Sequence, residues 1–145
     1  MMKTTETVLL VEDNADDEEL TRLAFEDNAI AAELVVVRDG LEALEYLFCR
    51  GRYAGRKDSP LPRLVLLDIK LPKVNGHEVL DSIRADERTK RLPVVMLTTS
   101  SEAKYCQDSL GLGADVFLRK PVDFQSFSAA LGQIARAWLP AAVPR

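Results

Sequence analysis

The acids best placed for chemistry each follow a short apolar run. Asp68 comes directly after the apolar residues 64–67, and Glu12 and Asp13 come directly after the run that ends at Val11. A continuous short apolar run is typical of a strand buried on both faces of a parallel sheet. In such sheets, ligands bind outside the carboxyl ends of the strands. We therefore expect Asp68 to be a partly exposed, reactive carboxylate with two further acids beside it.

Two more apolar runs end in groups that suit the same site. Thr98 closes the run 94–98, and Lys120-Pro121 closes the run 115–119. Three converging carboxylates repel one another, and a hard divalent cation such as Mg²⁺ resolves that repulsion with oxygen ligands. Lys120 then offers a point charge for a phosphoryl oxygen, and Thr98 offers a hydroxyl donor. Because carboxylates form aspartyl phosphates, Asp68 can act as a nucleophile, and the set predicts phosphoryl transfer.

The elements that must position these residues alternate along the chain. Apolar runs predict strands at 7–12, 34–37, 64–68, 94–98 and 115–119. Helical spacing predicts helices between them, over 15–28, 41–48, around 79–83, 101–110 and 124–138. We expect loops at 51–61 and 69–75, with turns at Asp39-Gly40 and Asn75-Gly76. The pattern predicts an α/β fold, a doubly wound five-stranded parallel sheet with helices on both faces.

Two helices carry apolar positions that indicate their buried faces. In the helix over 15–28, Leu20, Leu23 and Ala24 share one face, and the acids 16–19 in its first turn complement the helix dipole. In the last helix, apolar residues recur at steps of three and four and form one stripe: Phe124, Phe127, Leu131, Ile134 and Trp138.

Bulk properties narrow the class of protein. The 145 residues suit one domain, with a core over about 7–138 and an apolar arm over 139–145. A net charge of −4 disfavours nucleic-acid binding. The apolar run 8–11 is too short for a signal-peptide core and no stretch approaches the length of a membrane span, so we expect a cytoplasmic protein. Cys49, Cys106 and His77 could supply at most three zinc ligands, and nothing in the sequence brings them together. His77 follows the Asn75-Gly76 turn on a predicted surface helix, so we expect it to be solvated and without a role in the site.

The set Glu12-Asp13, Asp68, Thr98 and Lys120-Pro121 resembles the response-regulator receiver domain of two-component signalling. The resemblance spans about 7–138 and implies a flavodoxin-like fold. It implies that Asp68 is the phosphoacceptor and takes its phosphoryl group from a histidine kinase.

The resemblance also implies roles for the surrounding residues. Mg²⁺ would be bound by Asp13, Asp68 and the backbone carbonyl of Lys70, with Glu12 holding metal-bound water. Thr98 and Lys120 would bind the phosphoryl oxygens, and Thr98 would switch together with the aromatic Phe117. The Lys120-Pro121 bond would be cis.

Several features depart from the commonest receiver pattern. The first acidic pair is Glu-Asp, the aromatic switch is Phe117 without a hydroxyl, and Thr99 stands where alanine is frequent. The loop 51–61 is longer than in minimal receivers. That loop, with the runs 71–76 and 97–100, is most similar to small stand-alone regulators paired with phytochrome-type histidine kinases. By the same resemblance, the last helix and the arm 139–145 would form a homodimer.

The function expected from these features is that of a phosphorelay switch without an output domain, not an enzyme. Two alternative functions remain, an enzyme and a binding scaffold. A phosphatase with an aspartyl nucleophile resembling the haloacid dehalogenases would need a second carboxylate at Lys70, and a receiver-like scaffold that is never phosphorylated would normally lose the acids or Lys120. Flavin or nucleotide binding is disfavoured because no glycine-rich loop follows any strand. The sequence identifies neither the kinase nor the downstream target.

Overall fold

A five-stranded parallel sheet forms the centre of the chain. The computed structural model describes residues 6–56, 60–68, 71, 73–98, 114–119 and 123–139, without the side chains of Thr98, Phe117 and Arg119. The strands lie in the order β2-β1-β3-β4-β5, and all neighbours are parallel. This is the order of a flavodoxin-like doubly wound sheet and confirms the expected fold class. The strands are β1 (Glu6–Val11), β2 (Ala32–Val37), β3 (Leu64–Asp68), β4 (Val94–Thr98) and β5 (Val116–Arg119).

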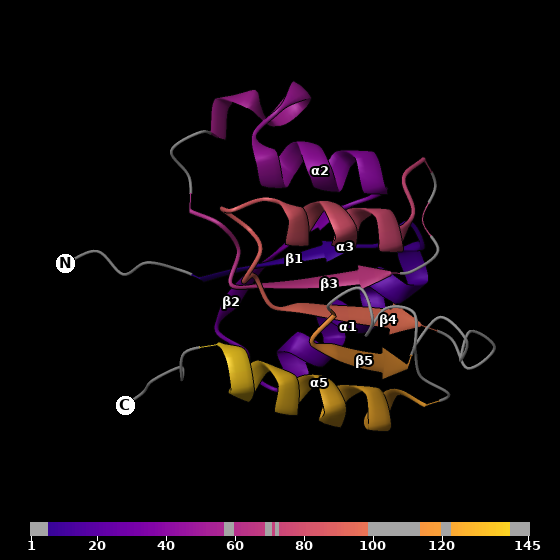
Figure 1. Cartoon of the computed structure of the whole chain (residues 1–145). Coiled ribbons are helices and arrows are strands. Elements are labelled where there is room, and N and C mark those ends of the chain that lie inside the picture. The colour runs from indigo at the N-terminus through magenta and orange to yellow at the C-terminus, as the bar shows by residue number, and fades with distance from the viewer. Residues whose placement is uncertain are drawn as a thin grey trace.

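Helices cover both faces of the sheet. Figure 1 shows α2 and α3 together on one side of the strands and α5 on the other. Residues of α1 and α5 share one apolar core with the sheet, and residues of α2 and α3 share a second. The described helices are α1 (Ala15–Asp27), α2 (Gly40–Phe48), the 3₁₀ helix η1 (Gly51–Arg56), α3 (Gly76–Ala85) and α5 (Phe124–Trp138).

The strands supply alternate side chains to these two cores. Leu9 and Val11 of β1 lie in the core beneath α2 and α3, whereas Val8 and Leu10 lie in the core beneath α1 and α5. All four are fully buried, since successive strand side chains point to opposite faces and both faces are covered. The same division holds along β3 and β4. Continuous apolar runs therefore mark buried parallel strands, as predicted.

Polar caps begin the helices, and two of them correct our expectations. Asp39 and Asn75 do not form isolated turns with the glycines that follow them, because each is the N-cap of a helix that starts at that glycine. Their side-chain oxygens accept bonds from backbone amides three residues later, which would otherwise lack partners. At Asn75, the side chain of Glu78 completes a capping box by accepting the Asn75 amide at 3.1 Å.

The expected loop over 51–61 was partly wrong. Its first half is η1, which packs against α2 through aromatic and cationic contacts. The rings of Tyr46 and Tyr53 meet edge to face at 5.2 Å, and the guanidinium of Arg56 lies 3.7 Å from the Tyr46 ring centroid. The glycines suggested irregular backbone, whereas η1 is held by side-chain contacts with α2 that no local repeat records.

The buried face of α1 also differs from the expected one. Leu23 is 41% exposed, whereas Thr21, Ala24 and Phe25 are buried. Because α1 packs against α5 as well as the sheet, tertiary contacts rotate it away from the face that leucine spacing indicated. In α5, Phe127, Leu131 and Ile134 are buried and confirm the predicted stripe.

The helix expected at 101–110 and most of the arm at 139–145 lie outside the described residues. Among the residues that are described, no helix is both long and apolar enough to cross a membrane.

Candidate metal and phosphoacceptor site

Three acids meet where β1 and β3 end. The two strands pair directly, with Val11 opposite Leu67. One residue further along each strand, Glu12 and Asp68 lie at the same edge of the sheet, and Asp13 follows at once. The backbone amide of Glu12 donates to the carbonyl oxygen of Val37 at 3.0 Å, which holds the end of β1 against β2.

The carboxylates of Glu12, Asp13 and Asp68 form one cluster. One oxygen atom from each lies within 4.8 Å of the others. Glu12 is fully buried and Asp68 is 5% exposed, so the expectation that Asp68 is partly exposed was wrong; Asp13 is the exposed member. The cover over both faces of β3 thus extends to its last side chain, and Asp13 is the acid of the cluster that solvent reaches.

Charge and ligand chemistry both fit a divalent cation at this cluster. Negative charges at such separations repel strongly where water is excluded, and a cation between them removes that cost. Mg²⁺ prefers oxygen ligands, needs only one or two carboxylates and keeps several waters. Two buried acids and one exposed acid offer that combination.

The turn after β1 keeps the first two acids in place. The backbone amide of Asn14 donates to Glu12 Oε2 at 3.4 Å, and the Asn14 side chain accepts from the Asp17 amide at 2.9 Å as the N-cap of α1. Glu12 and Asp13 are therefore held between a strand end and a capped helix.

The other predicted site residues are described only in part. Thr98 ends β4, next to Leu97, which pairs with Asp68, so its backbone lies at the same edge of the sheet. The backbone of Phe117 lies in β5 opposite Met96. The side chains of both, together with Lys70, Lys120 and the Pro121 peptide bond, lie outside the described residues.

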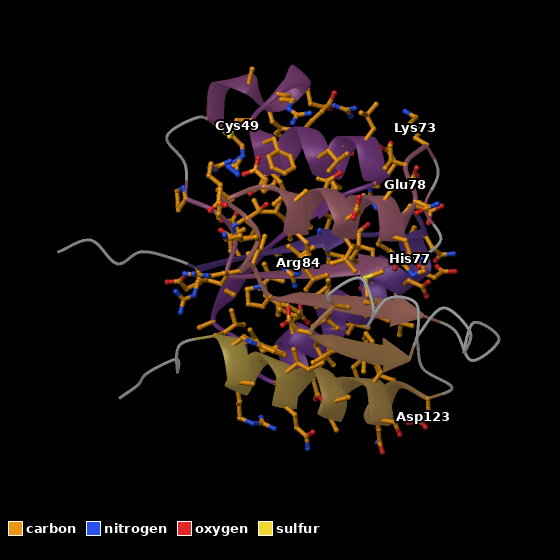
Figure 2. All side chains as sticks on the ribbon, viewed as in Figure 1. Cys49, Lys73, His77, Glu78, Arg84 and Asp123 are labelled. Carbon is orange, nitrogen blue, oxygen red and sulfur yellow. The ribbon has the colours of Figure 1, made fainter. Side chains whose placement is uncertain are left out.

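Zinc ligands do not gather in the described part of the chain. There, Glu12, Asp13 and Asp68 make up the one group of three or more acids, cysteines or histidines close enough to hold a metal. Cys49 is a free, half-buried thiol at the end of α2, and Cys106 lies outside the residues that the structure describes. His77 is half-buried in the first turn of α3, near the sheet edge where the strands end (Figure 2).

Sequence reasoning missed an ion-pair system beside this edge. Glu18 of α1 contacts Arg38, which follows β2, and also pairs with Arg22 at 2.9 Å. The hydrogen bond from Arg38, supported by Arg22, lowers the pKa of the Glu18 carboxyl against the opposing effect of burial. Glu18 thus forms a tertiary contact in addition to complementing the helix dipole. The sequence indicates only its pair with Arg22, because the two residues stand four apart on one helix.

Comparison with known proteins identifies the architecture around the cluster. Residues 8–132 match the response regulator receiver domain family. The chain belongs to this family. Among curated relatives, it is 37% identical to the response regulator Rcp1 of Synechocystis sp. over 91% of this chain and 88% of that one. It is 39% identical to the probable methanogenesis regulatory protein FilR2 of Methanothrix harundinacea, over 91% and 83% of the two chains.

Solved receiver structures include close matches from light signalling. The phosphorylated cyanobacterial phytochrome response regulator RcpA superposes with a TM-score of 0.83 at 36% identity, covering 98% of this chain and all of that one. The bacteriophytochrome response regulator AtBRR gives 0.82 at 40% identity, covering 99% and 100%. This receiver is therefore homologous to phytochrome response regulators, as the sequence predicted.

Two similar structures hold divalent cations. Rcp1 was solved with Mn²⁺ (TM-score 0.81, 34% identity, 97% and 99% coverage). The receiver domain of the sensor histidine kinase PA1611 from Pseudomonas aeruginosa was solved with magnesium in its active-site cleft (0.71, 26%, 93% and 98%). The cluster of Glu12, Asp13 and Asp68 fits such a cation.

Proposed function

We propose that this receiver accepts a phosphoryl group on Asp68 from a histidine kinase of the phytochrome type. Support comes from the buried position of Asp68 at the end of β3, within 4.8 Å of two further carboxylates. It comes also from the likeness to phytochrome response regulators. The signal would pass on through protein contacts, as in a family of signalling switches.

In this proposal, the residues of the chain position the cation and the phosphoryl group. An oxygen of Asp68 forms a bond to phosphorus as the bond to the kinase histidine breaks. Asp13, Asp68 and the backbone carbonyl of Lys70 would bind Mg²⁺, with Glu12 holding metal-bound water. The cation supplies positive charge for the phosphoryl oxygens, so the burial of Glu12 and Asp68 no longer opposes an incoming anion. The chain would then release phosphate only slowly, as a switch and not as an enzyme.

Thr98 and Lys120 complete the proposed site at the ends of β4 and β5. Thr98 would donate its hydroxyl and Lys120 its charge to the phosphoryl group, with Phe117 moving alongside Thr98 and Pro121 following a cis bond. The backbone positions of Thr98 and Phe117 in neighbouring strands are compatible with this coupling.

Phosphorylation can be tested by intact mass. Incubation with acetyl phosphate and Mg²⁺ should add one phosphoryl group to the wild-type chain and none to Asp68→Asn. Asp81→Asn, which changes an exposed acid on α3, is the matched control and should be modified like the wild type. An unmodified wild type, or a modified Asp68→Asn, contradicts the proposal.

We also propose that residues 1–145 form a single receiver domain with its core over about 7–138, and that the last helix and the arm, 139–145, join a homodimer. Phe127, Leu131 and Ile134 are buried in the core, and Trp138 and Leu139 pack against it but stay half-buried where α5 ends. Sedimentation of the full chain against a chain ending at Ala137 tests this, with the unfolding transition of both recorded as a control. If both sediment as monomers, the dimer proposal is wrong.

A further inference from the structure

The chain segment that follows Asp68 rests on the N-terminus of α2. A Cβ atom on Gly40 would lie 1.7 Å from the carbonyl oxygen of Val74 and 2.6 Å from its carbonyl carbon. Real Cβ atoms do not approach other atoms this closely, and backbone atoms cannot turn aside as a side chain can. Only glycine allows this approach, so the place of Val74 depends on residue 40.

An ion pair holds the same two segments together. Lys73 Nζ lies 3.6 Å from Asp39 Oδ2, while Asp39 Oδ1 accepts the Glu42 amide at 2.8 Å as the cap of α2. Asp39 is 8% exposed, so its carboxylate is fixed between the helix and the lysine. Lys73 has a φ of 69°, in the left-handed region that residues other than glycine rarely adopt. Figure 2 shows Lys73 beside this end of α2, on the side of the molecule where the strands end.

The segment is also held at both of its ends. Leu71 is 9% exposed and belongs to the core beneath α2 and α3, and Asn75 is held by its capping box. Only two residues separate Leu71 from Asp68. If a Cβ atom on Gly40 displaces Val74 and with it Leu71, the displacement therefore acts only three residues from Asp68.

We propose that Gly40, with the Asp39–Lys73 pair, is a positioning element that sets the affinity of the acidic cluster for its divalent cation. This rests on the proposed function. Mg²⁺ requires near-ideal ligand geometry, so a displaced strand end weakens its binding. By linkage, the bound cation would in turn stabilise the contact between α2 and the segment 73–75.

Glycine substitutions test the positioning. Gly40→Ala should weaken the binding of Mn²⁺, followed by its electron paramagnetic resonance, about tenfold or more. Gly55→Ala, where a Cβ meets nothing within 4 Å, should bind as the wild type does. Gly132→Ala, where a Cβ meets Asn28 Oδ1 at 2.2 Å, should lower stability without changing the Mn²⁺ affinity. Wild-type affinity in a folded Gly40→Ala overturns the inference.

Lys73→Met tests the inference by the direction in which it changes the Mn²⁺ affinity. It remains a complete test if Gly40→Ala does not fold. If charge alone mattered, removing the positive charge of Lys73 should tighten cation binding at the acidic cluster, because like charges repel. Loss of positioning should instead weaken it, by about two- to fivefold for an ion pair as exposed as this one. Amide exchange at Lys73 and Val74 should rise as well. Tighter or unchanged Mn²⁺ binding overturns the inference, whereas failure of the wild type to bind Mn²⁺ overturns the proposed metal site itself.

Discussion

The side-chain nitrogen of Asn28, at the end of α1, donates to the carbonyl oxygen of Ser128 in α5 at 2.8 Å. The same nitrogen lies 3.0 Å from Ser128 Oγ and 2.9 Å from the carbonyl oxygen of Ala24. Ser128 Oγ donates to Asp27 Oδ2 at 2.6 Å. Gly132 packs against Asn28 with no room for a Cβ atom. One polar junction thus joins two helices a hundred residues apart on the same face of the sheet.

Asn28→Ala should lower the free energy of unfolding by about 1–3 kcal/mol, because buried partners in α5 lose their bonds. Urea denaturation measures this, with Gln133→Ala on the exposed side of α5 as a control that should change little. Gly132→Ala forces the Asn28 side chain out of place, so the two effects should not add in the double variant. Full additivity would mean that the junction does not act as one unit.

Asp13→Asn should reverse its effect on stability when Mg²⁺ is added. Without the cation, the change relieves repulsion within the cluster and should raise the melting temperature. At Mg²⁺ a hundredfold above the Kd, the wild type should gain about 2.7 kcal/mol, and the variant much less. Thermal melts with Mg²⁺ and with a chelator measure both effects. Equal gains in the two proteins would remove Asp13 from the metal site.

Acid should weaken the contact between α1 and the end of β2. The Arg38 and Arg22 side chains hold the pKa of Glu18 below its ordinary value of 4.5, so the folded state favours the ionised carboxyl. Its contribution is present above pH 4.5 and is lost as the pH falls through the lowered pKa. The unfolding free energy of the wild type and of Glu18→Gln, measured across this range, should converge as the pH falls. Parallel curves would contradict the ion-pair system.

Alkali should act on the contact between η1 and α2. Burial, with the hydrogen bond that Tyr53 donates to Glu42 Oε2 at 2.6 Å, raises the pKa of Tyr53 to about 12. Because the folded state favours the neutral phenol, Tyr53 contributes stability that is fully present below pH 10. That contribution is lost as the pH rises through about 12. Ultraviolet titration should show a late phenolate that Tyr53→Phe lacks. Over the same range, the stabilities of the two proteins should approach each other.

Much of the framework could be predicted because it depends on local pattern. The strand at 64–68 and the acids at 12, 13 and 68 were recognisable since a buried parallel strand must be continuously apolar and its polar end must face the ligand edge. The 3₁₀ helix at 51–56 was missed because Tyr53 and Arg56 find their partners on α2, and no local repeat records that. The burial of Asp68 was misjudged because exposure at a strand end depends on the elements that cover the sheet, which the strand's own pattern does not record.

By itself, the sequence determined the alternation of strands and helices, the parallel sheet and the acids placed at its carboxyl edge, because burial on both faces imposes a continuous apolar pattern. Only the tertiary structure decided which face of α1 is buried, how Asn28 joins Ser128 and why residue 40 must be glycine. These depend on close approaches between segments distant in the chain. The space at such a contact depends on both segments together, so the sequence of either segment alone does not determine it.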